Sequence, residues 1–300
     1  MLNVTVGIIT YQRPEMLDRL LGELAAQTFT LDPAPQVSIL VVDNDAAGSA
    51  RPVCDKARLA GQNVIYVSEP VKGIPNARNR VLTSLPDGTD VLAWINDNGS
   101  PAPTWLDQLL TMYQETEADI IMGATGALLP DGAPEWIRKG GFFSRRRFVD
   151  YATLAEGASN NCLISARALR DSGLTYDETL RDLGGSDTVF FRAAADKKLR
   201  MVWNVDALVQ EHIPISRCSL RWLMRRHYRA GNTLALSDLK LDGIMGWLRR
   251  LNRGTQKLLQ GIITLPLALA GFHELARSLL ALSRGAGMFA GLMGIKVREN

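Results

Sequence analysis

Apolar runs that end in polar residues recur along the first half of the chain. Four of these runs are residues 4–9, 37–42, 64–67 and 90–95. Each is short and rich in Val, Ile and Leu, which is typical of a buried strand. After the first run, apolar residues from Met16 to Leu24 recur at helical spacing, and residues 75–85 predict another helix. Strands that alternate with helices predict an α/β fold, with a parallel sheet that carries helices on its faces.

Polar side chains follow three of these predicted strands. Thr10 and Arg13 follow the first, Asp43 follows the second, and the triplet Asn96-Asp97-Asn98 follows the fourth. A solvated turn is the alternative interpretation of the triplet, since Asn, Asp and Gly are ordinary turn residues. The carboxyl ends of parallel strands meet at one edge of a sheet, where ligands bind. The repetition therefore predicts a ligand or cation site at this edge.

The middle of the chain carries further polar motifs. The segment 73–79 begins a predicted helix, and Arg78 within it favours a phosphate or nucleotide, although a solvated arginine on a capped helix is the alternative. Asp187 precedes the predicted helix 189–195, where it would be a catalytic carboxylate or a helix cap. A polar run at 157–161 precedes an apolar strand, and Glu211-His212 ends a strand-like segment.

Charge divides the 300-residue chain unevenly. The whole chain carries +3, whereas the residues from Ile213 onward hold 14 lysines and arginines against four acids, which is +10. The first 212 residues therefore carry −7. Three cysteines lie far apart and show no metal-ligand spacing, which suits a reducing compartment. The first residues lack the features of a signal peptide, and we interpret them as a strand.

The basic C-terminal part is also apolar. Residues 258–272 are uncharged but only 15 residues long, which is short for a membrane span of about 20 residues. Basic and apolar residues together favour a membrane surface over nucleic acid, with two or three helices that lie in the interface or form a shallow hairpin. A soluble helical subdomain that packs on the main body is the alternative. We predict a catalytic domain at 1–237 and a membrane-associating region at 238–300, on the cytoplasmic face of the inner membrane.

The ordered motifs resemble those of a known family. They are Thr10 to Pro14, Val41 to Asn44, Gly73 to Asn79, Trp94 to Pro101, Gly184 to Thr188, and Glu211-His212 with the arginines that follow. In this order they resemble the inverting glycosyltransferases of family 2, and in particular bacterial exopolysaccharide glycosyltransferases of the succinoglycan type. The resemblance covers roughly residues 4–233. It implies the GT-A fold, a Rossmann-like nucleotide-diphospho-sugar transferase sheet with helices on both faces.

The resemblance implies a single in-line displacement by an acceptor hydroxyl, with Asp187 as general base. The implied nucleotide-sugar residues are Thr10, Arg13, Asp43, Arg78, Asn96 and Asp97. The implied ligands of Mg²⁺ or Mn²⁺ are Asp97, Asn98 and His212. The implied diphosphate or acceptor residues are Arg217, Arg221, Arg225 and Arg226. The expected partners are a nucleotide-sugar donor, with UDP favoured, a lipid-linked saccharide acceptor and a membrane surface, without nucleic acid.

Three positions depart from the family pattern. Asn96 and Asn98 stand where the metal motif usually has Asp, and Ser186 stands where Glu usually precedes the catalytic Asp. An amide offers a neutral oxygen, so we expect weak metal binding. The alternative function is a catalytically silent GT-A domain that binds nucleotide or scaffolds an assembly complex. A nucleotidyltransferase is disfavoured, because no Gly-rich phosphate loop follows the first strand.

Overall fold

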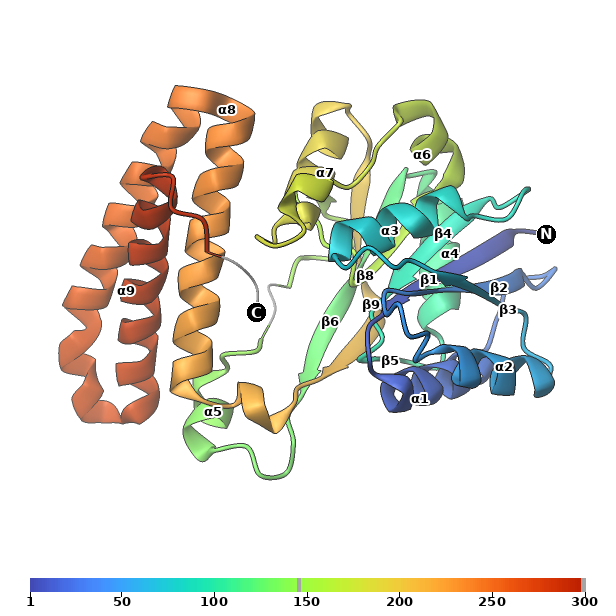
Figure 1. Cartoon of the computed structure of the whole chain (residues 1–300), viewed down its shortest axis with the longest axis horizontal. Helices are drawn as coiled ribbons and strands as arrows, with labels where there is room; N and C mark the ends of the chain where they lie inside the picture. The colour runs from blue at the N-terminus through green and yellow to red at the C-terminus, as the bar shows by residue number, and fades with distance from the viewer. Residues whose placement is uncertain (145–146, 298–300) are drawn as a thin grey trace. The chain divides into compact units, whose positions relative to one another are not determined.

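The computed structural model describes residues 1–144 and 147–297. These residues form two compact units. The sheet unit is made of Met1–Gly126, 147–181 and Ser186–His212. The helical unit is made of Ala127–Ser144, Asp182–Gly185 and 213–297. Figure 1 shows the strands and the covering helices of the first unit, and the long helices of the second.

One half of the sheet is parallel, as the apolar runs predicted. Its strands are β1 (Asn3–Thr10), β2 (Gln36–Asp43), β3 (Val64–Ser68) and β4 (Val91–Ile95), in the order β3-β2-β1-β4. Thr10 at the end of β1 lies opposite Asp43 at the end of β2. The carboxyl ends of these two strands are therefore level, and the polar residues that follow them meet at one edge.

The other half of the sheet runs antiparallel, which the expectation of a parallel sheet did not include. Its strands are β5 (Gly99–Pro101), β6 (Ile120–Leu128), β7 (Thr153–Leu154), β8 (Asn161–Ser165) and β9 (Met201–His212). The order continues β4-β8-β6-β9-β5, and β7 pairs with β9. Ile95 at the end of β4 pairs with Asn161 at the start of β8. Because β8 begins at the edge where β4 ends, the two strands must run in opposite directions.

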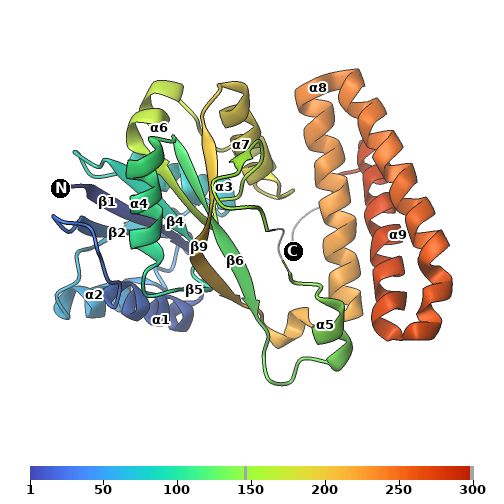
Figure 2. The same ribbon diagram turned by 180° about the vertical axis from the view of Figure 1, so that it is seen from behind.

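Helices cover both faces of the sheet (Figures 1 and 2). The helices on one face are α1 (Pro14–Ala25), α2 (Arg51–Leu59) and α4 (Trp105–Thr116). Those on the other are α3 (Ile74–Thr83), α6 (Ala166–Ser172) and α7 (Ser186–Asp196), with the short turn η1 (Glu178–Leu180). Each face has its own apolar core, the first around Leu17, Trp105 and Leu109, and the second around Val81, Phe190 and Phe191.

The helical unit consists mainly of long helices. Its elements are α5 (Glu135–Gly140), η2 (Ile215–Arg217), α8 (Leu220–Thr264), η3 (Leu265–Ala270) and α9 (Phe272–Leu292). Gly243 interrupts α8 with φ 55° and ψ −128°, so the chain folds back there. A Cβ at Gly287 would lie 1.9 Å from the carbonyl oxygen of Tyr228, so the small residue allows α9 to pack closely against α8.

These boundaries differ from the expected domain boundary after residue 237. Position 237 lies within α8, and the compact helical unit already includes the chain from Ile213 onward. The division follows the packing of α5 and α9 against the start of α8, which charge patterning along the sequence does not reveal. Within residues 1–144 and 147–297, no helix is long and apolar enough to cross a membrane.

Candidate active site at the carboxyl ends of the strands

The ends of β1 and β4 bring three of the predicted residues together. Thr10 Oγ1 donates a hydrogen bond to Asp97 Oδ2 at 3.1 Å, and Arg13 Nη1 pairs with Asp97 Oδ1 at 3.1 Å. Asp97 is buried, and this burial raises the pKa of its carboxyl above the usual range, while Arg13 and Thr10 act in the opposite direction. Neighbouring parallel strands end side by side, which is why residues 84 or more positions apart make these contacts.

Asp43 lies beside this cluster but is engaged by its own loop. Its carboxylate accepts hydrogen bonds from the backbone N–H groups of Asp45 at 3.0 Å and Ala50 at 2.8 Å, and from the Tyr66 hydroxyl at 3.1 Å. Burial, followed by the charge of Asp43, raises the pKa of Tyr66. Asp43 therefore shapes the loop after β2, and its contact with a nucleotide stays a prediction.

Asn44, which the sequence analysis did not assign, ties this loop to the start of α3. Its side-chain amide donates to the carbonyl oxygens of Glu69 and Val71, both at 2.8 Å, and accepts from the Gly73 N–H at 2.8 Å. A buried amide that serves three backbone groups fixes the position of the helix start. The signal in the sequence was its place directly after Asp43 at a strand end.

The predicted base, Asp187, is held by two side chains. Asp187 Oδ1 is paired with Arg78 Nη1, and it accepts a 2.8 Å hydrogen bond from Ser159 Oγ. Ser159 also contacts the Tyr176 hydroxyl at 2.6 Å, and the Arg78 guanidinium lies 5.3 Å from the Tyr176 ring. α7 begins at Ser186, so Asp187 lies in the first turn of this helix and not before it, and its side chain contacts Arg78 and Ser159 instead of the helix backbone. Arg78 contacts the predicted base, whereas its predicted contact with a nucleotide is untested.

Asn96 and Glu211 belong to a second network at the same edge. Asn96 Nδ2 lies 3.5 Å from Glu211 Oε1, and Asn160 Nδ2 donates to the same oxygen at 3.1 Å and to Thr125 Oγ1 at 3.0 Å. Glu211 is buried. An Asp at position 96 would face this carboxylate at close range, whereas an amide can donate to it. The contact gives a structural reason for the amide at position 96.

Asn98 and His212 meet mainly through the backbone. The His212 N–H donates to the Asn98 carbonyl at 2.9 Å, and Asn98 Nδ2 lies 3.3 Å from the His212 carbonyl oxygen. The imidazole Nε2 lies 3.1 Å from Ser100 Oγ, which donates to Glu23 Oε1 at 2.8 Å. Burial lowers the pKa of His212, and Arg19 acts in the same direction. The ring is therefore neutral at neutral pH, which is the form that can bind a metal.

The three predicted metal ligands suit a divalent cation in donor type. Asp97, Asn98 and His212 offer a carboxylate, an amide oxygen and a neutral imidazole, a set compatible with Mn²⁺. Within residues 1–144 and 147–297, however, no group of three His, Cys, Asp or Glu side chains is placed to hold a metal ion. Arg13 and Thr10 engage the oxygens of Asp97, and the His212 ring contacts Ser100. A cation at Asp97 would have to replace Arg13.

The four predicted diphosphate or acceptor arginines lie in the helical unit. Arg217 belongs to η2, and Arg221, Arg225 and Arg226 belong to the first turns of α8. The guanidinium groups of Arg217 and Arg226 lie 5.5 Å and 5.3 Å from the Trp222 ring. A cavity of about 520 Å³ is lined by Arg225, Arg226 and Arg229, together with Trp222, Met224, Tyr228, Ser283 and Val297. Arginines with aromatic walls are suited to a phosphorylated ligand.

Two comparisons of the sequence agree with one another. The family model for glycosyl transferase family 2 matches residues 5–173, more than half of the chain. The succinoglycan biosynthesis protein ExoM of Rhizobium meliloti (strain 1021) is 31% identical over 233 residues, which cover 77% of this chain and 74% of that protein. The glucosyl-dolichyl phosphate glucuronosyltransferase of Haloferax volcanii is 22% identical over 257 residues, which cover 79% of this chain and 78% of that protein.

Solved structures match the fold at low sequence identity. The mannosyltransferase PcManGT of Pyrobaculum calidifontis, solved with GDP-Man and Mn²⁺, gives a TM-score of 0.64 at 13% identity, covering 97% of this chain and 87% of that chain. S. aureus TarS 1-349 in complex with UDP gives 0.56 at 14% identity, covering 98% and 92%. Against a longer TarS chain the TM-score is 0.59 at 13% identity, covering 96% of this chain and 55% of that one. These likenesses confirm the predicted GT-A fold.

Proposed function

Because this chain belongs to glycosyltransferase family 2, we propose that it transfers a sugar with inversion from a nucleotide-diphosphate donor, UDP-sugar foremost, to an acceptor hydroxyl. The acceptor we propose is a lipid-linked saccharide or a growing polysaccharide in cell-surface polysaccharide assembly. The names of two relatives, a succinoglycan biosynthesis protein and an enzyme that acts on a dolichyl phosphate, support this acceptor class. The observation that carries the proposal is the placement of Asp187 at the sheet edge that also holds Asp97.

The arrangement of Asp187 suits general-base catalysis. The acceptor hydroxyl attacks the anomeric carbon, a new carbon–oxygen bond forms, and the bond to the diphosphate oxygen breaks on the opposite face. The carboxylate takes the hydroxyl proton as the nucleophile forms its bond. Arg78 and Ser159 both engage Oδ1, so we assign proton acceptance to Oδ2. The two contacts of Oδ1 hold the carboxylate in one orientation and thereby also fix the position of Oδ2.

The donor would bind around Asp97 and the start of α3. Thr10 and Arg13 hold Asp97 at the carboxyl ends of the parallel strands, where nucleotides bind in open α/β sheets. Asn76 Oδ1 and Arg78 Nε are buried and have no hydrogen-bond partner among residues 1–144 and 147–297. Both atoms are covered by the surrounding protein, so the contact of Arg78 with a nucleotide stays a prediction.

A divalent cation is the proposed cofactor, with Asp97 and Asn98 as its first candidates for ligands. When bound, it would neutralise charge on the departing diphosphate. Solved neighbours contain Mn²⁺, including PcManGT and a GalNAc-T7 structure with UDP and GalNAc. Arg13 is half exposed, and its charge balances Asp97 when no cation is bound. When a cation binds Asp97, Arg13 would be free to contact the donor phosphates.

The catalytically silent alternative rested on Asn96, Asn98 and Ser186. The contacts of the two amides weaken this alternative, because each amide nitrogen faces an oxygen of β9 that an aspartate would repel.

The acceptor residues we propose remain Arg217, Arg221, Arg225 and Arg226, whose guanidinium groups suit a lipid-linked diphosphate.

The test is release of nucleotide diphosphate from a panel of UDP- and GDP-sugars with Mn²⁺, with and without a lipid extract from the source membranes. The proposal predicts release from a UDP-sugar, faster with the extract, and a product of inverted anomeric configuration by proton NMR. Nucleotide binding without release from any donor would support the silent alternative. A product with retained configuration would overturn the assignment of Asp187 as base.

A further inference from the structure

The helical unit exposes large apolar side chains at both of its ends. The chain folds back at Gly243 and again at η3, so the start of α8, η3 and the start of α9 share one end. The exposed side chains around Gly243 include Leu239, Leu241, Ile244, Met245 and Leu248. Those of the η3 end are Leu259, Ile262, Ile263, Leu267, Leu269 and Phe272. Leu269 at the tip of η3 is 97% exposed. A group of exposed apolar side chains is typical of a surface that binds a partner or a membrane.

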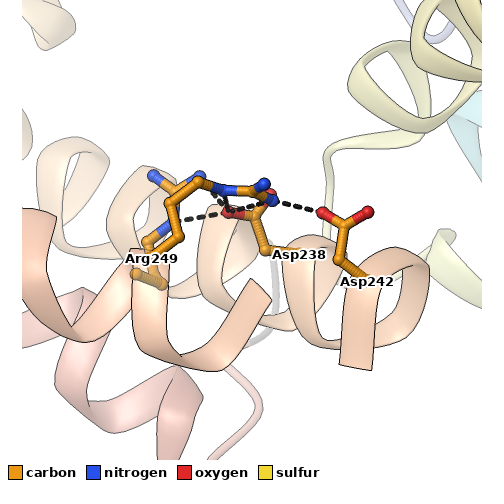
Figure 3. A network of polar contacts seen from close by, with 4 residues as sticks. Asp238, Asp242 and Arg249 are labelled. Atoms are coloured by element: carbon orange, nitrogen blue, oxygen red, sulfur yellow. Dashed lines mark hydrogen bonds and ion pairs between the residues drawn. The ribbon is translucent and has the colours of Figure 1, made fainter. Parts of the chain in front are cut away.

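Charges at the Gly243 end are engaged with one another. Arg250 pairs with Asp238 at 2.6 Å, and Arg249 pairs with both Asp238, at 3.3 Å, and Asp242 (Figure 3). Asp238 and Arg250 are both buried. These pairs join the two arms of α8 across the Gly243 turn. At this end two acids, Asp238 and Asp242, stand against three cations, Lys240, Arg249 and Arg250, so the excess of positive charge is small.

Two groups of aromatic side chains are in contact at the η3 end. Phe272 lies edge-on to Trp136 with ring centroids 5.2 Å apart, and Trp136 contacts Phe142 at 5.4 Å. Next along the chain, Phe143 stacks on Trp222 at 6.0 Å. The first group joins the start of α9 to α5 and the residue Phe142 after it, and the second joins Phe143 to the first turn of α8. Tryptophan beside an apolar tip is typical of side chains at a membrane–water interface.

Basic side chains surround this apolar tip. Arg277 Nη2 donates to the Gly140 carbonyl at 3.2 Å, which places the end of α5 beside α9. The cations of these segments are Arg138, Lys139, Arg217, Arg221, Arg225, Lys257 and Arg277, and the acids are Asp131, Glu135 and Glu274. Glu274 pairs with Arg277 at 2.6 Å, and Glu135 with Lys139 at 3.6 Å. The cations outnumber the acids, so this end complements an anionic surface.

We propose that the η3 end is a docking surface for an anionic lipid bilayer. The apolar side chains of η3 and of the last turn of α8 enter the boundary between head groups and acyl chains, and the basic residues of α5, α8 and α9 contact lipid phosphates. The Gly243 end remains in water. This surface places the acceptor arginines Arg221 and Arg225 at the height of lipid head groups. Docking is independent of the glycosyltransferase proposal, because it requires neither donor nor metal.

The experiment is co-sedimentation of the full chain with vesicles of phosphatidylcholine alone or mixed with phosphatidylglycerol. The test variant is Leu267→Glu/Leu269→Glu, and the matched control is Ile244→Glu/Met245→Glu at the other apolar end. We expect the wild type and the control to bind the mixed vesicles, and the test variant to bind roughly tenfold more weakly or worse. A third variant, Arg138→Glu/Lys139→Glu, should weaken binding and reduce its dependence on salt.

Several results would overturn the proposal. Equal losses in the test variant and the control would remove the preference for the η3 end, and binding to neutral vesicles as strong as to anionic ones would remove the role of charge. Sedimentation velocity without lipid tests whether a second copy of this chain occupies the η3 end instead. If the wild type self-associates but does not bind vesicles, and the η3 variant no longer self-associates, this end is a protein interface. Melting curves show that each variant is folded, and UDP binding by all of them separates a docking failure from a failure of the catalytic proposal.

Discussion

Two carboxylate–arginine pairs of the candidate active site, Arg13 with Asp97 and Arg78 with Asp187, differ in which partner faces the solvent. In the first pair the side chain of Asp97 is 6% exposed and that of Arg13 is 44% exposed. In the second pair the order is reversed, with Arg78 at 6% and Asp187 at 28%. A buried partner is fixed by its surroundings, whereas an exposed partner can contact a ligand. We therefore propose that Arg13 and Asp187 contact substrates, that Arg78 holds Asp187 in place, and that Asp97 holds Arg13 when no cation is bound.

The largest expected effect follows from removing the exposed carboxylate of the second pair. Asp187→Asn keeps the shape and the contact with Ser159 but cannot accept a proton at neutral pH. Turnover should fall by about 10²- to 10⁴-fold while UDP affinity changes little. The measurement is steady-state transfer together with calorimetric titration of UDP.

Asp171→Asn is the matched control, because Asp171 is an exposed acid that pairs with Arg167 on α6 at 3.4 Å. This variant should retain normal turnover. If Asp187→Asn also retains turnover with an unchanged melting temperature, Asp187 is an ordinary helix-start residue, and Glu211 becomes the next candidate for the base.

A smaller effect should follow from loosening the hold on Asp187. Ser159→Ala removes the 2.8 Å hydrogen bond to Oδ1 and leaves Arg78 in place. Turnover should fall by roughly tenfold, since a hydrogen bond to a charged group contributes on the order of 1.5 kcal/mol. Ser172→Ala serves as control, because the Ser172 hydroxyl donates to the Leu169 carbonyl within its own helix, α6. An unchanged rate would mean that Arg78 alone positions the carboxylate.

The smallest effects concern the amides beside Asp97. Asn98→Asp should tighten Mn²⁺ binding by roughly tenfold or less, because an anionic oxygen replaces a neutral one. The variant also loses the contact from Nδ2 to the His212 carbonyl, which lowers the free energy of unfolding by about 1 kcal/mol. Asn96→Asp makes a useful contrast, since the new carboxylate would face Glu211 and destabilise the protein without a gain in Mn²⁺ affinity. Equal Mn²⁺ affinity in wild type and Asn98→Asp would place position 98 outside the metal site.

The sequence predicted the parallel half of the sheet better than the antiparallel half. The runs that became β1 to β4 are bounded by polar tips and alternate with helices, so their positions and parallel direction follow from local patterns. Their order in the sheet, β3-β2-β1-β4, was not predicted. The pairing of β4 with β8 joins Ile95 to Asn161, and no local pattern specifies a partner that distant. The sequence indicated a polar run at 157–161 before a strand, but it did not predict that this run lies at the same sheet edge as Asp97.

The same limit applies to the site. The meeting of Thr10, Arg13 and Asp97 could be predicted, because neighbouring parallel strands align their carboxyl ends. The pair of Arg78 with Asp187 spans 109 positions and depends on α3 and α7 lying on the same face of the sheet. In the sequence, each of the two residues could be assigned only to its own motif. The roles of Asn44 and Ser159 as polar supports were missed for a related reason, because amides and hydroxyls in such runs are also common in turns.

The most direct test compares the two arginines of the pairs in one assay. Arg13→Gln and Arg78→Gln should be measured side by side for UDP affinity, turnover and melting temperature. The account predicts that Arg13→Gln weakens UDP binding more than it lowers turnover, because the exposed guanidinium contacts the donor. It predicts that Arg78→Gln lowers turnover with little change in UDP affinity, because the buried guanidinium acts through Asp187. A loss of UDP affinity in Arg78→Gln as large as in Arg13→Gln would contradict this division of roles.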